Sequence, residues 1–238
     1  MNRNEFMLGI RNGIPICLGY FSVSLAFGVT AVLSGLPAWA AVVISVTNLT
    51  SAGQFAGANL IVSGGTYVEV AVSMLIINIR YFLMSLSLSQ KVEERMTLGQ
   101  RLAVAFGITD EIFAVAIQQP RPLSASYMAG LIATPVLGWS GGTLVGAVAT
   151  SVLTPMISNA LGIALYGMFI AIIIPPAREK RSVLFAVLLA AALSSAFYYL
   201  PMLKAVSSGW SIILVTLAVS GLAALLFPID PERGEEKQ

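Results

Sequence analysis

The sequence has 238 residues, of which 57% are hydrophobic and only 10% charged, with a mean hydropathy of +0.87 and a net charge of +2. Soluble domains are roughly 45–50% apolar and about 25% charged, so this composition indicates an integral membrane protein. A single cysteine, Cys17, excludes an internal disulfide and a cysteine metal cluster, and the absence of histidine removes the commonest metal ligand. No metal or cofactor is therefore expected, and the scattered basic residues give no basis for nucleic-acid binding.

The apolar residues come in blocks of about 20, the length of a membrane-crossing helix, and not in the alternating segments of a barrel. We therefore predict an all-α, polytopic membrane helix bundle of about six to eight hydrophobic segments, one or two of them interrupted or re-entrant. The candidate segments are Ile14–Ser34, Ala38–Val62, Thr66–Ser89, Leu102–Gln118, Ser124–Thr150, Val152–Ile174, Ser182–Leu200 and Ser211–Phe227. Residues 1–238 are expected to form one membrane domain, with cytoplasmic loops near 90–101 and 175–182 and a short polar tail at 229–238.

A polar run, Ser45–Gly57, lies inside the second of these segments and has the sequence SVTNLTSAGQFAG. Unmade hydrogen bonds in hydrocarbon cost several kcal/mol, so such a run has to face protein or a water-filled cavity. Two interpretations stand side by side. The run is a substrate site at a helix break, or its small residues form an interface between closely packed helices.

The basic residues allow two topologies, because short cytoplasmic loops are enriched in Lys and Arg. If all segments cross, eight basic residues lie inside and four outside. If Ala38–Val62 and Ser124–Thr150 each enter and leave on one side, the count becomes ten inside and two outside, Arg121 and Lys204. Both segments contain Gly or Pro, and paired interrupted segments indicate a transporter's binding site. In either topology the N- and C-termini are cytoplasmic.

One basic residue, Arg80, lies within a predicted span, nine residues or roughly 14 Å before Ser89. An arginine at that depth costs at least about 2.5–3.5 kcal/mol and should have a partner. Asp110 and Glu111 in the next segment lie at equal depth if the two segments form an antiparallel hairpin. Successive helical residues point about 100° apart, so only one of the acids can face Arg80. The pair either gates transport, leaving the other acid for a proton or a substrate amine, or simply fixes helix register.

Several signals of other activities are missing from the sequence. There is no Gly-rich phosphate-binding loop with Lys, so the sequence gives no sign of transport driven by ATP. There is also no His-Glu-x-x-His motif and no nucleophile paired with a base that would indicate an enzyme. Glu69 near a segment start suits the helix dipole and is interpreted as structural. Gly138, Gly142 and Gly146 form a stripe that predicts close helix contact, within the chain or with a partner subunit.

Four motifs together resemble the AzlC family of branched-chain amino-acid permeases, in both order and spacing. They cover the first half of the chain and are Gly13-Ile14-Pro15 through Ala26-Phe27-Gly28, Thr50-Ser51-Ala52-Gly53-Gln54-Phe55, Asn78-Ile79-Arg80-Tyr81 and Phe106-Gly107-Ile108-Thr109-Asp110-Glu111-Ile112-Phe113. The resemblance implies a secondary transporter of the bacterial inner membrane that exports branched-chain and related amino acids together with a small AzlD-type membrane subunit.

Carried over by residue, the family's Ser-Gln element falls on Ser51 and Gln54, its membrane arginine on Arg80 and its acidic element on Thr109, Asp110 and Glu111. Tyr81 stands where some members have His, and Tyr166-Gly167 replaces a proline kink in a later helix. Both departures bear on how this chain handles protons and shapes its site.

Two hypotheses follow. In the first, the chain is an exporter for amino acids of the valine, leucine, isoleucine and methionine class, and transport is coupled to protons. Its substrate-binding residues are Asn48, Thr50, Ser51, Gln54 and Phe55, and its coupling and gating residues are Arg80, Asp110, Glu111, Asn78 and Thr109. In the second, the chain is a non-transporting membrane assembly subunit whose polar run is a helix-packing interface.

Overall fold

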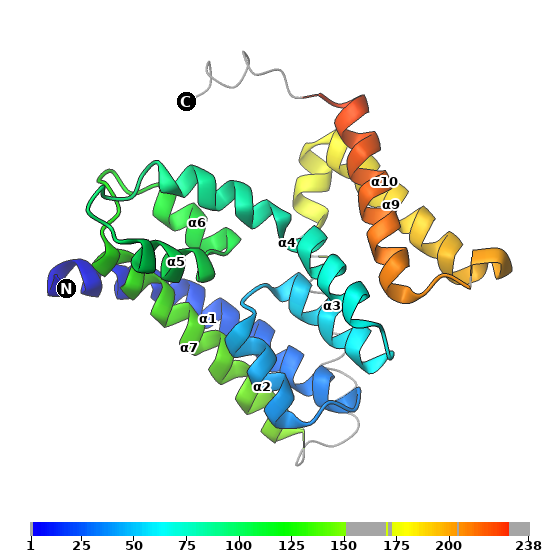
Figure 1. Ribbon diagram of the computed structural model, residues 1–238, viewed down its shortest axis with the longest axis horizontal. Helices are drawn as coiled ribbons and strands as arrows, with labels where there is room; N and C mark the ends of the chain where they lie inside the picture. Colours follow the sequence, from blue (N-terminus) through cyan, green and yellow to red (C-terminus); the bar gives the residue numbers. More distant parts are fainter. Residues whose placement is uncertain (1, 151–169, 171–172, 204, 229–238) are drawn as a thin grey trace.

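The computed structural model describes residues 2–150, 170, 173–203 and 205–228 (Figure 1). Over these residues the fold is all-α without a β-strand, as predicted, and five helices are long and apolar enough to cross a membrane. The predicted segment Val152–Ile174 lies mostly outside the described residues, and Tyr166, Gly167 and the tail at 229–238 lie wholly outside them. The helices are α1 (Arg3–Leu33), α2 (Ala38–Thr47), α3 (Ser51–Val62), α4 (Tyr67–Ser89), α5 (Leu98–Phe106), α6 (Asp110–Ile117), α7 (Ala125–Ala149), α9 (Arg181–Tyr199) and α10 (Ser208–Leu226), with a 3₁₀ turn η1 (Pro201–Leu203).

The scaffold of the bundle is a parallel pair, α1 and α7, which lie side by side along their lengths (Figure 1). Glycines allow the backbones to touch: Gly130 faces the Phe6 carbonyl, Gly138 faces Cys17 and Gly146 faces Leu25. A β-carbon at any of these positions would overlap the other helix. The predicted glycine stripe is therefore confirmed as a contact within the chain.

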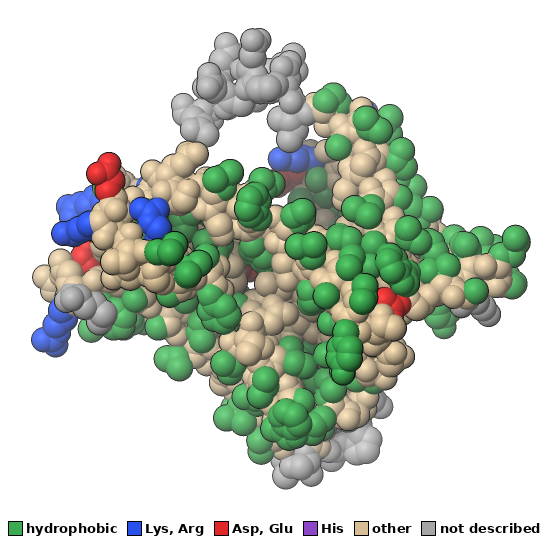
Figure 2. All heavy atoms as spheres, in the orientation of Figure 1, with side chains coloured by type: hydrophobic (Ala, Val, Ile, Leu, Met, Phe, Trp, Pro, Cys, Tyr) green, Lys and Arg blue, Asp and Glu red, His purple; other side chains and the backbone are tan. Residues whose placement is uncertain are grey.

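Two ends of the bundle are distinguished by charge. At the end where α1 and α7 begin, the Ser124 hydroxyl donates to Glu5. The Leu123 N–H donates to the Lys91 carbonyl at the same end. We call this the basic end, because Arg3, Lys91, Arg95 and Arg121 lie there. In Figure 2 most of the visible charged side chains gather over it, near the N-terminus, while hydrophobic side chains cover much of the rest of that face. The opposite end holds the link from α1 to α2 and the link from α3 to α4.

The helices α2 and α3 form a pair that enters and leaves the bundle at the opposite end. Leu36, just before α2, and Val62, at the end of α3, line the same cavity beside Ser34. Between the helices, Asn48 and Thr50 have extended backbones, which interrupts the helix. The prediction that Ala38–Val62 is interrupted and re-entrant is confirmed.

The second such pair is α5 and α6, and it enters from the basic end. The loop at 90–97 leads into α5, and the Lys91 ammonium donates to the Ile117 carbonyl at the end of α6. The break lies at Gly107 to Thr109. The prediction of one continuous helix over Leu102–Gln118 is therefore wrong, because a glycine followed by a Thr N-cap ends one helix and begins another.

The prediction that Ser124–Thr150 is interrupted is also wrong, since α7 runs unbroken through Pro135 and the glycine cluster. Its glycines serve the contact with α1, and a proline is tolerated where a neighbouring helix covers it, as Gly13 of α1 covers Pro135. The second interrupted segment of the bundle is therefore 98–117, and 124–150 is continuous. Arg121 consequently joins Lys91 at the basic end, and neither predicted charge count is met.

Of the last two described helices, α10 packs against α4, and α9 packs against α10. Ser207, the N-cap of α10, donates to Glu69, which also accepts from the Thr66 backbone and hydroxyl in a capping box at the start of α4. Glu69 is 5% exposed, so its structural interpretation is confirmed. The helix α9 leads into α10 through η1, and α10 starts at the end of the bundle where α4 starts.

Candidate functional site

The two helix breaks meet in the middle of the bundle. Each contains an aliphatic residue, a threonine N-cap and a polar first helical residue: Leu49-Thr50-Ser51 before α3 and Ile108-Thr109-Asp110 before α6. The helix pairs that contain the breaks enter the bundle from opposite ends. The N-termini of α3 and α6 therefore reach the same region from opposite directions (Figure 1). Broken helices of this kind form the substrate sites of many secondary transporters.

Both breaks border one cavity of about 420 Å³, within the range of small-molecule pockets. Its wall combines an aliphatic side, an aromatic side and a carboxylate side. The lining residues are Pro15, Ile16, Gly19, Tyr20, Val23, Leu49, Ser51, Tyr81, Thr109, Asp110, Glu111 and Trp139.

On the α6 side of the cavity, Glu111 is held by an aromatic hydroxyl. The Tyr20 hydroxyl donates to Glu111 Oε2 at 2.5 Å and lies 2.6 Å from Thr109 Oγ1. Thr109 also caps α6 by accepting from the Ile112 N–H at 3.4 Å. Tyr20 thus fixes the Glu111 carboxylate at the cavity wall without neutralising its charge.

The other acid of α6 is paired with the membrane arginine. Arg80 Nη2 lies 2.9 Å from Asp110 Oδ2 and donates to the Tyr81 hydroxyl at 3.1 Å, while the guanidinium stands over the Tyr81 ring. Glu111 makes neither of these contacts. The predicted division, in which Arg80 takes one acid and leaves the second, is therefore what the geometry shows.

On the α3 side the helix N-terminus is left open. Thr50 is the N-cap, but its side chain makes no capping hydrogen bond, and its Oγ1 is buried without a partner among the described residues. Asn48 Oδ1 accepts from the Thr50 N–H at 3.2 Å. The first-turn N–H groups of α3 and the positive end of its dipole therefore point to the cavity region beside Ser51, uncompensated by an acidic side chain.

Gln54, one turn into α3, is anchored from α7. Trp139 Nε1 donates to Gln54 Oε1 at 3.0 Å, and the Trp139 ring packs edge-to-face on Tyr20 with centroids 5.1 Å apart. Gln54 is fully buried, and its Nε2 has no partner within the described part of the chain. Asn78 Oδ1 on α4 is likewise buried without a partner there, facing the same turn of α3 at Gly53. Such groups carry a cost of about 1–3 kcal/mol unless water or a ligand satisfies them.

The structure thus sorts the predicted residues into layers. Ser51, Thr109, Asp110 and Glu111 line the cavity. Gln54 and Arg80 contact residues that line it, while Asn48, Thr50 and Asn78 lie at or beside the break before α3. Phe55 does not line it: its ring packs edge-to-face on Phe27, and it borders a separate cavity toward the opposite end.

Sequence reasoning missed Tyr20 and Trp139, the two aromatic side chains that tie the breaks to the scaffold. Both lie in apolar segments where an aromatic residue reads as core, and nothing in their local sequence points to a polar partner. A buried Tyr or Trp needs a partner for its hydroxyl or N–H, which is the only signal that could have marked them.

The sequence of residues 15–153, more than half of the chain, matches the family model described as AzlC protein. The chain belongs to the AzlC family. The matched region spans most of α1 and all of α2 to α7, and so contains both helix breaks and the cavity between them.

Among named relatives of this AzlC family member, the "Inner membrane protein YgaZ" of Escherichia coli K12 is 28% identical over 196 residues, covering 79% of this chain and 80% of the relative. An "Uncharacterized membrane protein" of Archaeoglobus fulgidus is 28% identical over 182 residues, covering 74% and 78% respectively. No solved structure matches the chain. Together with the apolar helices, the family and these relatives identify a multi-pass membrane protein of the transporter type.

Proposed function

We propose that this AzlC family protein is the large subunit of a secondary transporter that exports branched-chain and related amino acids across the bacterial inner membrane. The observation that carries the proposal is the asymmetry of the two helix N-termini at the cavity. One is positive and open, and the other carries Asp110 and Glu111. An α-amino acid has the complementary pair of charges.

In this mechanism the substrate carboxylate binds at the first turn of α3. The free N–H groups there, the Ser51 hydroxyl and the Gln54 amide supply hydrogen-bond donors, and the helix dipole favours the negative charge. Trp139 holds the Gln54 oxygen, so the nitrogen of the amide is the end that remains for a ligand.

The substrate ammonium binds at Glu111. Of the two acids on α6, Asp110 is committed to Arg80, whereas Glu111 is held, among the described residues, by the Tyr20 hydroxyl. The aliphatic wall of Ile16, Val23 and Leu49 then meets the substrate side chain and favours a branched apolar one. With no histidine in the chain, Glu111 is also the carboxylate placed to take a coupling proton when the ammonium is absent.

A small AzlD-type membrane subunit is part of the proposal. The Arg80 and Asp110 side chains are 46% and 40% exposed, although Arg80 lies well inside α4. Charged groups at that depth are costly to expose to hydrocarbon, so a partner helix or water has to cover them. The uncovered ion pair supports a protein partner on the face formed by α4 and α6.

Efflux of labelled valine, leucine, isoleucine and methionine from loaded cells tests the proposal. Cells carry this chain with and without a co-expressed small membrane protein of the AzlD type. We expect efflux of at least one of these amino acids that needs both proteins and disappears in Glu111→Gln. Correctly inserted proteins that move none of the four would overturn the branched-chain assignment.

The same basic end is proposed to face the cytoplasm, because Lys and Arg are enriched in cytoplasmic loops. Both termini then lie inside, as does the 90–97 loop. Labelling an introduced cysteine at Glu94 from the outside of intact cells would contradict this orientation.

The alternative of a non-transporting assembly subunit has less support. Ser45 and Gln54 of the polar run form hydrogen bonds with Thr143 and Trp139 inside the chain, and so are not left for a partner subunit.

A further inference from the structure

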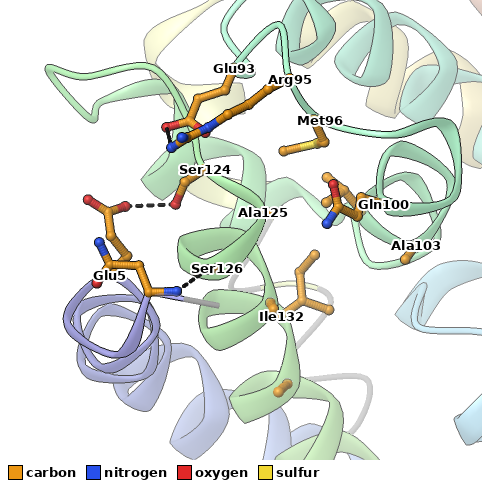
Figure 3. A pocket seen from close by; sticks show the side chains of 14 residues that line it. Glu5, Glu93, Arg95, Met96, Gln100, Ala103, Ser124, Ala125, Ser126 and Ile132 are labelled. Carbon is orange, nitrogen blue, oxygen red and sulfur yellow. Dashed lines mark hydrogen bonds and ion pairs between the residues drawn. The ribbon is translucent and has the colours of Figure 1, made fainter.

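A second and larger cavity, of about 780 Å³, opens at the basic end between the start of α1, the helix α5 and the start of α7. Its rim is polar: Glu5, Glu93, Arg95 and Ser124 surround it, and Figure 3 shows Glu5 and Ser124 joined by a hydrogen bond. Its inner part is apolar, with Ile132 of α7 well below the rim. We call this cavity the vestibule.

The vestibule and the central cavity follow one another along the same helix. Ala125, Ala129 and Ala133 line the vestibule at four-residue intervals, and Trp139 lines the central cavity less than two turns further along α7. Between them the Ile132 side chain presses on Gly107, the first residue of the second helix break. A β-carbon at Gly107 would overlap Ile132. The break that supplies Thr109 and Glu111 to the central cavity is therefore also the partition below the vestibule.

We propose that the vestibule is the entry site for the transported zwitterion at the basic end, and that the contact of Ile132 with Gly107 is the partition that opens toward the central cavity. The inference rests on the proposed transport function and extends it to a site outside the broken-helix cavity. The pair of α5 and α6 is the element that moves, because it is joined to the scaffold through far less surface than α1 shares with α7.

The rim chemistry fits the same substrate class. Arg95 is bound to Glu93 through two hydrogen bonds, of 2.7 and 3.2 Å, so these charges offset each other. Glu5 accepts only a neutral hydroxyl, from Ser124 at 2.7 Å, among the contacts the structure gives its carboxylate. An ammonium group is therefore attracted to the rim, while the alanine-lined wall leaves room for an apolar side chain.

Cysteine labelling tests whether the vestibule is a water-filled path. In the full complex carrying Cys17→Ala, Ala129→Cys is exposed to a membrane-impermeant methanethiosulfonate in inside-out vesicles. The matched control is Leu137→Cys, which lies two turns further along α7 and is 73% exposed outside both cavities. A thiol reacts only where water supports its thiolate, so Ala129→Cys should react and Leu137→Cys should not.

Protection by substrate tests whether the labelled cavity lies on the transport path. An amino acid that the complex exports should slow modification of Ala129→Cys at least about tenfold at saturation, and the modified protein should lose flux. Reaction of Ala129→Cys only with a lipid-soluble maleimide would show a lipid crevice and overturn the proposal. So would impermeant labelling that leaves both flux and substrate affinity unchanged. If the unmodified complex moves no amino acid, the transport function fails instead, and reagent access still decides whether the vestibule is aqueous.

The partition has its own test. Gly107→Ala should reduce flux about tenfold or more, because the added methyl group strains the closed contact, and Ile132→Ala in the same protein should restore most of it. Gly99→Ala is the control on α5, since a β-carbon there meets nothing within 4 Å. Failure of Ile132→Ala to rescue a well-inserted Gly107→Ala protein would exclude the partition.

Discussion

The two helix breaks share a local sequence pattern and differ in charge. At the first, Thr50 leaves its helix uncapped and Ser51 follows, so α3 presents a bare positive end. At the second, Thr109 caps α6, and Asp110 and Glu111 occupy its first turn. The first break is tied to the scaffold through a neutral pair, Trp139 with Gln54, whereas the second is tied through Tyr20 to a carboxylate.

The difference shows how one structural device can serve two chemical groups. A helix N-terminus alone attracts anions, but two carboxylates in the first turn more than cancel its partial charge of about half a unit. In the proposed mechanism the same arrangement therefore binds an anion at α3 and a cation at α6. Two such ends facing one cavity from opposite sides have the charge complementarity that the proposed zwitterionic substrate requires.

The largest expected effect comes from removing the available acid of the second break. Glu111→Gln should lower flux about 100-fold, the scale of a lost charged hydrogen bond of about 3 kcal/mol. Initial-rate efflux at saturating substrate measures it. The amount of inserted protein should stay normal, because Asp110 still pairs with Arg80. Glu94→Gln in the loop at the basic end is the matched control, and equal losses in both variants would refute the role of Glu111.

Making the first break resemble the second should have the next largest effect. Ser51→Asp places a carboxylate where the substrate carboxylate is proposed to bind, so the apparent affinity should fall about tenfold or more. Thermal stability should be kept or raised, because an acid in the first turn suits the dipole of α3. Ser51→Ala, which removes only a hydroxyl, should have a smaller effect. Tighter substrate binding in Ser51→Asp would contradict the assigned orientation.

The ion pair should respond as a unit. Either Arg80→Gln or Asp110→Asn alone leaves an unpaired charge at membrane depth and should reduce the yield of folded protein several-fold, because an unpaired charge is costly there. The double variant should recover much of that yield. Detergent-solubilised fluorescence size-exclusion profiles give the folded fraction. Additive losses in the double variant would show that the two side chains act independently.

Removing the Tyr20 hydroxyl should have a milder effect. Tyr20→Phe keeps the ring contact with Trp139 but frees Glu111, which should weaken substrate binding by roughly three- to tenfold, in keeping with one hydrogen bond of about 0.5–1.5 kcal/mol. Substrate-dependent thermal shifts measure the change. Tyr127→Phe is the control, because that hydroxyl accepts from Asn12 away from the cavity. A similar change in both variants would assign Tyr20 a general packing role.

The smallest expected effect on transport comes from the junction of α4 with α10. Glu69→Gln weakens the acceptor shared by Thr66 and Ser207 and should destabilise the protein by about 1 kcal/mol while leaving substrate affinity unchanged. Thermal unfolding with and without substrate separates the two quantities. An altered affinity would show that this junction communicates with the breaks.

Local sequence was sufficient where a residue type is costly in hydrocarbon. Arg80 required an acid, and equal depth along a hairpin selected Asp110 and Glu111 as its candidates. The polar run around Thr50 had to face protein or a water-filled cavity for the same reason, and a helix break was one of its two interpretations. Local sequence misjudged α7, because Pro135 and the neighbouring glycines look like helix breakers until α1 packs on them. It also missed the second break, where a single Gly107 followed by Thr109 gives a weak signal inside an apolar run.

Composition and hydrophobic block length by themselves determined an all-α membrane bundle, because backbone groups in hydrocarbon must be satisfied within each segment. They also determined which charges had to be paired at depth. Only the tertiary structure decided which acid Arg80 takes, that Tyr20 and Trp139 anchor the two breaks, and that these breaks face one cavity. Those outcomes depend on contacts between residues up to 91 positions apart, and local periodicity carries no information about such distances.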